Sequence, residues 1–350
     1  MDQSERPETA RPHALATSRG SVNHRKSVVS DDNDDDFSGQ SIAVVLPAYN
    51  EEILILETIA SLPAFVNRIY VVDDASQDKT CERVRAAMQK DGRISLICHR
   101  KNRGVGAAVA RGYKAALDEE QDVVCVMDAD GQMDPHDLAK IVRPVARGEL
   151  EYAKANRLFT DDAWETIPHY RYLGNAVLSL LTKIASGYWH IADSQSGYTA
   201  ISRAALERLN LDSVYPSYGY PNDMLVRLNV IGARVRNIPS RPVYGVGEHS
   251  NIRLHRVIPC ISWLLFKGFF RRLFHKYVIL DFHPLVFFYA FGLFCTLTGV
   301  ILGILKIFAQ SYMDVASPNI TVIIALALIS GTQFTLFAMW FDMESNRDLR

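Results

Sequence analysis

Short apolar runs alternate with longer amphipathic segments between Ser41 and about Gly148. The runs are SIAVVL (41–46), RIYVV (68–72), ISLIC (94–98) and DVVCVM (122–127), and each is followed by ten or more residues with the spacing of a helix. Strands that are apolar at nearly every position are buried on both faces, which is typical of a parallel sheet covered by helices. The pattern therefore predicts an α/β fold with right-handed crossovers and a ligand crevice at the carboxyl ends of the strands.

Two further apolar stretches lie near the C-terminus and are longer than the strands. Residues 285–305 contain no charged side chain, and residues 320–340 carry only Thr, Ser and Gln as polar interruptions. About 21 helical residues, at about 1.5 Å each, cover the hydrocarbon core of a bilayer. A buried helical hairpin of a soluble protein shows the same pattern, but two uncharged runs side by side favour transmembrane helices.

Residues 251–283 precede these stretches and mix aromatic side chains with cations. They are too charged to span a bilayer, so we expect one or two amphipathic helices that lie on the lipid headgroups. The loop 310–319 between the two spans has only Asp314 as a charged residue, whereas four cations flank the first span: Lys267, Arg271, Arg272 and Lys276. The positive-inside rule then places the residues before 285 on the cytoplasmic side.

The composition argues against several other classes of protein. With 38 Lys and Arg against 39 Asp and Glu, the formal net charge of -1 gives no sign of a nucleic acid partner. The first forty residues have the composition of a disordered tail, and the acidic run DDNDDD (31–36) lacks the Gly and Glu of a calcium loop. No GxGxxG, HExxH or CxxC motif is present and the five cysteines stand far apart, so we expect neither a nicotinamide cofactor nor zinc chemistry.

Polar clusters follow each predicted strand: PAYNEE (47–52), DDAS (73–76), HRKNRGVG (99–106) and DADGQ (128–132). Because the carboxyl ends of parallel strands meet at one edge of a sheet, we expect the clusters to line that edge. Side chains two apart in a strand point the same way, so Asp128 and Asp130 can aim at one point. Two hard oxygen donors suit Mg²⁺ or Mn²⁺, with Gln132 as a further ligand and a substrate phosphate completing the shell. The alternative is a simple helix start, for which Asp134 and Pro135 are well suited.

In combination, these stretches resemble glycosyltransferase family 2 enzymes of GT-A fold, most closely the polyprenyl-phosphate (dolichyl-phosphate) hexosyltransferases. The matching stretches, in family order, are VVLPAYNEE, VVDDASQDKT, NRGVGAAVARGY, VMDADGQMDP, KANRL, RYLGN, DSQSGYTAIS and YGYPND. The similarity runs from about Ile42 to the C-terminus. It implies transfer of a single hexose from a UDP- or GDP-linked sugar to polyprenyl or dolichyl phosphate, with inversion at the anomeric carbon.

The resemblance also implies which residues contact the nucleotide sugar. They are Pro47, Tyr49, Glu51, Asp73, Asp74, Asn102, Gly104 and Asp128. An aromatic face there can pack on the base, and carboxylates can accept hydrogen bonds from the base or the ribose. Asp128, Asp130 and Gln132 match the family's DxDxQ metal motif, whose ion offsets charge on the departing nucleotide. The alternative for PAYNEE and DDAS is a turn followed by a helix cap.

The resemblance further implies a set of catalytic residues: Asp130, Arg157, Arg171, Asp193, Gln195 and Asp223. Arg157 and Arg171 would hold the lipid phosphate, whose second pKa near ~6 leaves it anionic at neutral pH, so that no strong base is required. Surface pairing of these arginines with Asp161 or Asp162 is the alternative. Relatives with hydroxyl acceptors carry an acidic base at the position of Asp223, whereas the roles of Asp193 and Gln195 stay open.

The sequence departs from the family pattern in places. Ala155 stands where many relatives have Gly or Ser, and the QxxRW motif of processive polysaccharide synthases is absent after YGYPND, which favours a single transfer. The segment GVGEHSNIRLH after Tyr244 lacks apolar periodicity, so we expect a loop that orders when the nucleotide sugar binds.

The expected organisation has five segments. They are a disordered acidic tail (1–40), a GT-A catalytic domain (41–250), amphipathic interfacial helices (251–283), two transmembrane helices (within 284–342) and a cytoplasmic tail (343–350). We expect an integral membrane enzyme with a cytoplasmic catalytic domain, and a homo-oligomer is compatible with the sequence. Two other functions stay open: transfer to a hydroxyl of a lipid-linked oligosaccharide or glycolipid with Asp223 as base, and an inactive membrane scaffold.

Overall fold

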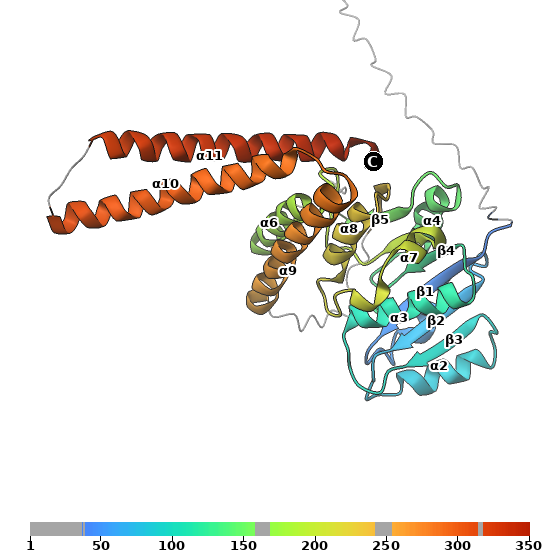
Figure 1. Cartoon of the computed structure of the whole chain (residues 1–350). Coiled ribbons are helices and arrows are strands. Elements are labelled where there is room, and N and C mark those ends of the chain that lie inside the picture. The colour runs from blue at the N-terminus through green and yellow to red at the C-terminus, as the bar shows by residue number, and fades with distance from the viewer. Residues whose placement is uncertain (1–36, 38, 158–168, 242–253, 314–317) are drawn as a thin grey trace, which may run out of the picture. The chain divides into compact units, whose positions relative to one another are not determined.

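A mixed β-sheet with helices on both faces forms the core of residues 42–239 (Figure 1). The computed structural model describes residues 37, 39–157, 169–241, 254–313 and 318–350, and within them seven strands are ordered β3-β2-β1-β4-β6-β5-β7. The strands are β1 (Ile42–Ala48), β2 (Arg68–Asp73), β3 (Ile94–Cys98), β4 (Val123–Val126), β5 (Tyr152–Asn156), β6 (Thr199–Ser202) and β7 (Val235–Pro239). β6 runs antiparallel to β4 and β5, and the other neighbours are parallel. The predicted α/β fold with a mostly parallel sheet is confirmed.

Both faces of the sheet are buried, as the continuous apolar runs predict. Along β1, Val45 packs on one face with α3 (Val105–Asp118), α7 (Arg203–Arg208) and α8 (Tyr220–Val230). Val44 and Leu46 pack on the other face with α1 (Ile55–Ala60), α2 (Thr80–Met88) and α4 (Leu138–Ala146). Each such side chain that is fully buried contributes roughly 1.5–3 kcal/mol of transfer free energy. Gly112 lets α3 approach β1 closely, since a Cβ there would lie 2.3 Å from Val45 Cγ1.

The strand register brings the polar clusters to one edge of the sheet. Ala48 of β1 pairs with Asp73 of β2, and Asp73 pairs with Cys98 of β3, so these three strands end level with one another. Val126 of β4 pairs with Val45, which places Asp128 beyond the carboxyl end of the same sheet. The shared edge that the sequence predicted is therefore present.

The strands β5, β6 and β7 were not expected from the sequence. β5 reads YAKAN and carries Lys154 at its centre, a residue type that is depleted in strands. Lys154 is nevertheless fully buried, and its Nζ donates a hydrogen bond to the carbonyl of Ser196. A tertiary contact 42 residues away along the chain thus overrides the local preference.

The predicted interfacial segment contains a helix, α9 (Leu254–Phe274), which is followed by a π-helical turn (His275–Leu280). Ile261 and Leu265 of α9 pack on α6 (His169–Ser186) and α8. The aromatic side chains on its other side are exposed, and they are Trp263, Phe266, Phe270 and Phe274. The helix therefore has one face on the catalytic part of the chain and one aromatic face that the described residues leave uncovered.

Three of the four cations that flank the first span bind protein groups. Arg271 Nη2 donates to Asp223 Oδ1 over 2.8 Å, and Lys276 Nζ donates to Asn346 Oδ1 over 2.6 Å. Arg272 is fully buried, with Nη1 and Nη2 at 2.8 and 2.9 Å from the two carboxylate oxygens of Asp342. No local pattern in the sequence reveals the two ion pairs, because Asp223 and Asp342 are 48 and 70 residues away from their arginines along the chain.

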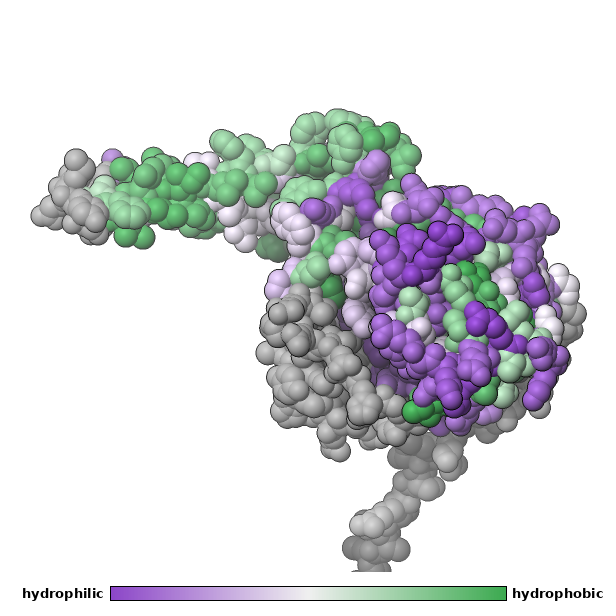
Figure 2. Space-filling view, turned by 90° about the horizontal axis from the view of Figure 1, so that it is seen from below, coloured by the Kyte–Doolittle hydropathy of each residue, from purple (hydrophilic) through white to green (hydrophobic). Residues whose placement is uncertain are grey.

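Two long apolar helices, α10 (Leu285–Met313) and α11 (Pro318–Ser345), pack side by side (Figure 1). Each contains a stretch long and apolar enough to cross a membrane, Leu285–Ala309 and Asn319–Ser345, and most of the residues in these stretches are exposed. The hairpin surface is accordingly mostly hydrophobic in Figure 2. Both predicted spans are helical, and the helices extend beyond the predicted ends.

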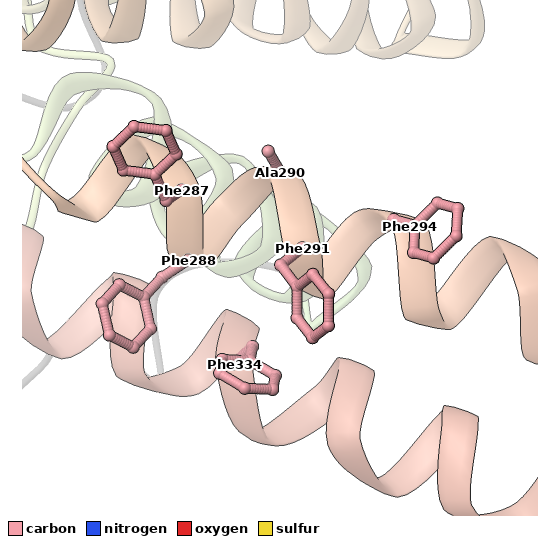
Figure 3. Close-up of a pocket in the computed structure, with 6 residues that line it drawn as sticks. All are labelled: Phe287, Phe288, Ala290, Phe291, Phe294 and Phe334. Carbon is pink, nitrogen blue, oxygen red and sulfur yellow. The ribbon is translucent and has the colours of Figure 1, made fainter.

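A cavity of about 500 Å³ lies along this hairpin. Its lining is Phe287, Phe288, Ala290, Phe291, Phe294 and Phe334 (Figure 3). The Phe291 and Phe334 rings meet edge to face across the two helices with centroids 4.9 Å apart. With no charged or hydrogen-bonding side chain in its lining, this cavity suits acyl chains and cannot recognise a sugar nucleotide.

The predicted cytoplasmic tail 343–350 is not a free tail. Helix α11 continues to Ser345, and Asn346 is buried with its Oδ1 accepting from Asn229 Nδ2 of α8 over 2.7 Å. The expected disordered tail, apart from its last few residues, and most of the expected loop after Tyr244 lie outside the described residues.

Candidate active site

The loop after β1 carries the first polar cluster and is tied to the loop after β2. Asn50 adopts a positive φ of 58°, and its Oδ1 accepts from the backbone N–H of Gln77 over 2.8 Å. The backbone N–H of Glu51 donates to Thr80 Oγ1 over 2.9 Å. These bonds fix the loop so that the ring of Tyr49 is 44% exposed, while Pro47 at the end of β1 is half-buried. An exposed ring on a fixed loop can stack on a flat ligand.

Asp73 offers a buried acceptor beside this loop. It is 2% exposed, and its Oδ2 accepts from the backbone N–H of Ser76 over 3.1 Å. Its Oδ1 receives no hydrogen bond from any N–H or O–H group in the described part of the chain. A buried carboxylate oxygen without such a donor is costly unless a ligand supplies one.

Asp128 and Asp130 lie beyond β4 with Glu51 close by. Burial, followed by the charges of Asp130 and Glu51, raises the pKa of Asp128 from 3.8 to about 7. Burial and the charge of Asp130 likewise raise the pKa of Glu51 to about 7. The like charges repel one another, and the hard oxygens of Asp128 and Asp130 are the donors that Mg²⁺ or Mn²⁺ prefers. The residues therefore fit a divalent ion.

The third residue of the predicted metal motif is less constrained. The backbone N–H of Gln132 donates to Asp130 Oδ1 over 3.0 Å, and its side chain is exposed. Gln132 thus orients Asp130 through the main chain, while its side chain faces solvent.

Arg157 and Asp193 face each other, and Arg157 lies near Asp128. Arg157 Nε lies 2.9 Å from Asp193 Oδ2, with 44% of the arginine side chain and 5% of the aspartate side chain exposed. Asp193 Oδ1 also accepts from the backbone N–H groups of Gln195 and Ser196, each over 3.1 Å. Burial acts to raise the pKa of Asp193, but the charge and hydrogen bonds of Arg157, together with the charge of Lys154, hold it below its usual value. Asp193 therefore anchors the guanidinium, whose exposed part can reach an anion.

Comparisons with known proteins identify the family of this chain. Residues 43–209 match the model of the family "Glycosyl transferase family 2". An uncharacterised protein of Methanocaldococcus jannaschii is 32% identical over 241 residues, which are 68% of this chain and 95% of that protein. The UDP-N-acetylglucosamine--dolichyl-phosphate N-acetylglucosaminyltransferase of Methanococcus voltae is 29% identical over 248 residues, 67% of this chain and 96% of that enzyme.

This chain belongs to glycosyl transferase family 2. The fold has a solved counterpart in glucosyl-3-phosphoglycerate synthase of Mycobacterium tuberculosis, crystallised with Mn²⁺, UDP and its product. That structure has a TM-score of 0.51 and 22% identity, and the match covers 67% of this chain and 80% of that one. The chain is thus a glycosyltransferase of GT-A-like fold.

Two residues predicted to contact the nucleotide, Asp74 and Gly104, have structural roles in the glycosyltransferase. Asp74 accepts from the backbone N–H groups of Arg103 (2.8 Å) and Gly104 (2.6 Å) and bonds to His99 Nδ1 (2.8 Å), so both of its oxygens are occupied. Gly104 has a φ of 94°, and a Cβ there would lie 2.4 Å from the carbonyl oxygen of Pro216. These contacts hold the loop before α3, in which Asn102 is exposed.

Asp223, the predicted base for a hydroxyl acceptor, lies between two arginines. Its Oδ2 lies 2.6 Å from Arg227 Nε and also accepts from the backbone N–H of Tyr215, while its Oδ1 lies 2.8 Å from Arg271 Nη2. Both carboxylate oxygens of Asp223 are therefore already bonded within the protein. Asp223 therefore joins α8 to α9, a role that the sequence did not indicate.

The structure describes the contacts of Gln195 but not the side chain of Arg171. Gln195 Nε2 donates to Asn222 Oδ1 over 3.1 Å, which links the Asp193 loop to α8. Arg171 lies in the first turn of α6, where the side chains are outside what the structure describes.

Lys154 and Tyr220 belong to the site and were missed by sequence reasoning. Lys154 is fully buried, and its pKa falls to about 7, chiefly through burial, although the nearby Asp193 and Asp128 oppose the change. The buried Tyr220 hydroxyl and Asp128 Oδ2 lie at 3.1 and 3.4 Å from the point where a Cβ on Gly197 would stand. The available signal was a lysine inside a short run of otherwise small or apolar residues.

Proposed function

We propose that this glycosyltransferase moves one hexose from a UDP- or GDP-linked sugar to polyprenyl or dolichyl phosphate at the cytoplasmic face of a membrane, with inversion. The carrying observation is that one chain joins the Asp128–Asp130 acid pair to two apolar helices long enough to span a bilayer. The dolichyl-phosphate relative from Methanococcus voltae supports the acceptor class.

The donor would bind along the edge formed by β1, β2 and β4. Asp73 Oδ1 is available to accept a hydrogen bond from the base, and the exposed Tyr49 ring can pack against it. Asp128 and Asp130, assisted by Gln132, would hold Mg²⁺ or Mn²⁺ against the diphosphate. When bound, such an ion supplies Lewis-acid stabilisation of the departing nucleotide.

The acceptor needs cations more than it needs a base. A phosphomonoester is already anionic at neutral pH because its second pKa is near ~6. Arg157, held by Asp193, presents a guanidinium that suits bidentate phosphate binding, and Arg171 is the second candidate. The aromatic face of α9 would lie on the headgroups and bring the lipid phosphate to this arginine.

The test is a direct assay of the full-length protein purified in detergent. It is incubated with Mn²⁺, a panel of UDP- and GDP-linked hexoses and either polyprenyl phosphate or polyprenol, and the lipid product is weighed by mass spectrometry. We expect one added hexose on polyprenyl phosphate with one donor of the panel and no product from polyprenol. Product from polyprenol alone would overturn the proposal.

Transfer to a membrane-bound hydroxyl with Asp223 as base is the second candidate. The two arginines on Asp223 disfavour it, and the variant Asp223→Asn separates the two functions. A hydroxyl acceptor requires the base, so the variant would abolish transfer. A phosphate acceptor requires none, so we expect reduced thermal stability with measurable transfer retained.

A further inference from the structure

Two cysteines and an aspartate meet at the edge of the sheet near the proposed base pocket. Asp73 is the last residue of β2 and Cys98 is the last residue of β3, and the parallel register places them directly opposite each other. Cys81 stands at the second position of α2, the helix that connects these strands. A thiol sulfur from each cysteine and a carboxylate oxygen of Asp73 all lie within 4.8 Å of one another.

We propose that Asp73, Cys81 and Cys98 form a binding site for Zn²⁺, separate from the Mg²⁺ or Mn²⁺ pair Asp128 and Asp130. Two thiolates and one carboxylate are a ligand set that tetrahedral zinc accepts, with the fourth position left to water. Thiolates are soft donors, whereas Mg²⁺ and Mn²⁺ prefer oxygen. The two sites of this chain therefore select different ions.

The distances favour a metal over a disulfide. The two sulfurs are 3.2 Å apart. With Zn–S bonds of about 2.3 Å, a tetrahedral ion holds two sulfurs about 3.8 Å apart. The sulfurs of Cys81 and Cys98 would therefore need to move apart by only about 0.6 Å. A disulfide needs sulfurs about 2.05 Å apart, which requires closure by about 1.1 Å. Binding a metal thus requires a smaller change in the sulfur–sulfur distance than forming a disulfide.

Burial gives the site both an unsatisfied ligand and an entrance. Asp73 is 2% exposed, and its Oδ1 lacks an N–H or O–H donor among the described residues. Cys98 is exposed and Cys81 is half-buried, so an ion can enter from solvent. On binding, both thiols lose their protons to water and the ion takes the place of the missing donor.

Zinc at this site would compete with the sugar nucleotide. This consequence rests on the proposed function, in which Asp73 Oδ1 accepts a hydrogen bond from the base. The same oxygen cannot serve a metal and a base N–H with full strength. Zinc occupancy should therefore weaken donor binding without touching the acids that hold Mn²⁺.

The test of the site uses Co²⁺ as a coloured substitute for zinc on the reduced full-length protein in detergent. We expect one bound Co²⁺ with sulfur-to-cobalt absorption in the near ultraviolet, displaced by Zn²⁺ and unaffected by excess Mg²⁺. Cys81→Ser and Cys98→Ser should each remove the absorption. Cys260→Ser is the matched control, because Cys260 is also exposed but lies on α9, and it should leave the absorption unchanged.

A second readout tests the consequence. Zn²⁺ should raise the KM for the nucleotide sugar at least about tenfold with little change in kcat. Removing all metal with a chelator and then adding Mn²⁺ alone should reverse this rise in the wild type, whereas Cys98→Ser should show no rise to reverse. The site is refuted if the absorption is absent, or if it survives in both cysteine variants. A thiol count that falls by two and that only a reductant restores would show a disulfide between Cys81 and Cys98. That result would also refute the zinc site. The cobalt spectrum is independent of transfer activity, so failure of the proposed function would leave this result readable.

Discussion

At the scale of single residues, the site is a group of acids held close together. Glu51 and Asp128 both have pKa values raised to about 7 by burial and by neighbouring carboxylates. Arg157 and Lys154 offset part of this charge at Asp128. A divalent ion bound between these acids would relieve their mutual repulsion.

The raised pKa of Asp128 predicts a pH-dependent stability effect in the metal-free protein. Between its ordinary value of 3.8 and the folded value of about 7, the folded state holds a proton that the unfolded state has lost. Stability from this group is therefore lost as the pH rises through that window. Asp128→Asn removes the charge, so the variant should melt at a higher temperature than the wild type at pH 8, and the gain should shrink towards pH 4.

Thermal melts in chelator at several pH values measure this difference. Asp118→Asn is the control, since Asp118 is an exposed residue on α3 and should show no such trend. A gain that is the same at pH 8 and pH 4 would contradict the assignment.

Arg157 gives the second residue-scale prediction. Its guanidinium holds Asp193, and 44% of its side chain is exposed. Arg157→Lys keeps the charge but loses the planar pair of donors, so the KM for polyprenyl phosphate should rise about tenfold or more while the KM for the nucleotide sugar changes little. Steady-state kinetics with each substrate varied separately measure this, and Arg203→Lys, on the surface of α7, is the control. An equal rise in both KM values would argue against a phosphate-binding role.

At the scale of elements, a buried ion pair joins the membrane hairpin to the rest of the chain. Arg272 of α9 and Asp342 of α11 are both fully buried, and the Tyr277 hydroxyl donates to Asp342 Oδ1 over 2.6 Å. Arg272 also donates to the carbonyls of Ile184 and Ala185 in α6. Three helices therefore meet on one guanidinium.

Removing one partner of this pair should cost roughly 3–5 kcal/mol, because the other charge is left buried and alone. Arg272→Met should therefore lower the unfolding temperature in detergent strongly, and Arg272→Met with Asp342→Leu should recover much of the loss. Arg347→Met is the control, since its pair with Glu344 is exposed and worth about 1 kcal/mol or less. If Arg272→Met and Arg347→Met have equal effects, the pair does not hold the helices.

At the scale of the whole molecule, the strands and helices that apolar patterns encode could be predicted from the sequence. The ion pairs between residues distant along the chain could not. Strands β1 to β4 and both apolar helices follow from continuous hydrophobic runs. Asp128 and Asp130 were found because they directly follow a buried strand. The pairing of Arg157 with Asp193 spans 36 residues, and that of Arg271 with Asp223 spans 48, so no local pattern reveals either.

The same limit explains the cysteines. Cys81 and Cys98 are 17 residues apart with no metal motif, and the sequence suggested isolated thiols. The crossover from β2 through α2 to β3 brings their sulfurs to 3.2 Å. The Cys81–Cys98 pair is created by the topology of the fold, which the spacing of cysteines along the sequence does not reveal.

The central claim is that a divalent ion held by Asp128 and Asp130 lets the sugar leave its nucleotide for a lipid phosphate. The most direct measurement is transfer to polyprenyl phosphate by the wild type and by the double variant Asp128→Ala with Asp130→Ala, each in chelator and after addition of Mn²⁺. We predict that chelator stops the wild type and that Mn²⁺ restores it. The double variant should stay at least about 10²-fold slower than the wild type with Mn²⁺, whether or not Mn²⁺ is added to it. Undiminished transfer by the double variant, or by the wild type in chelator, would contradict the account.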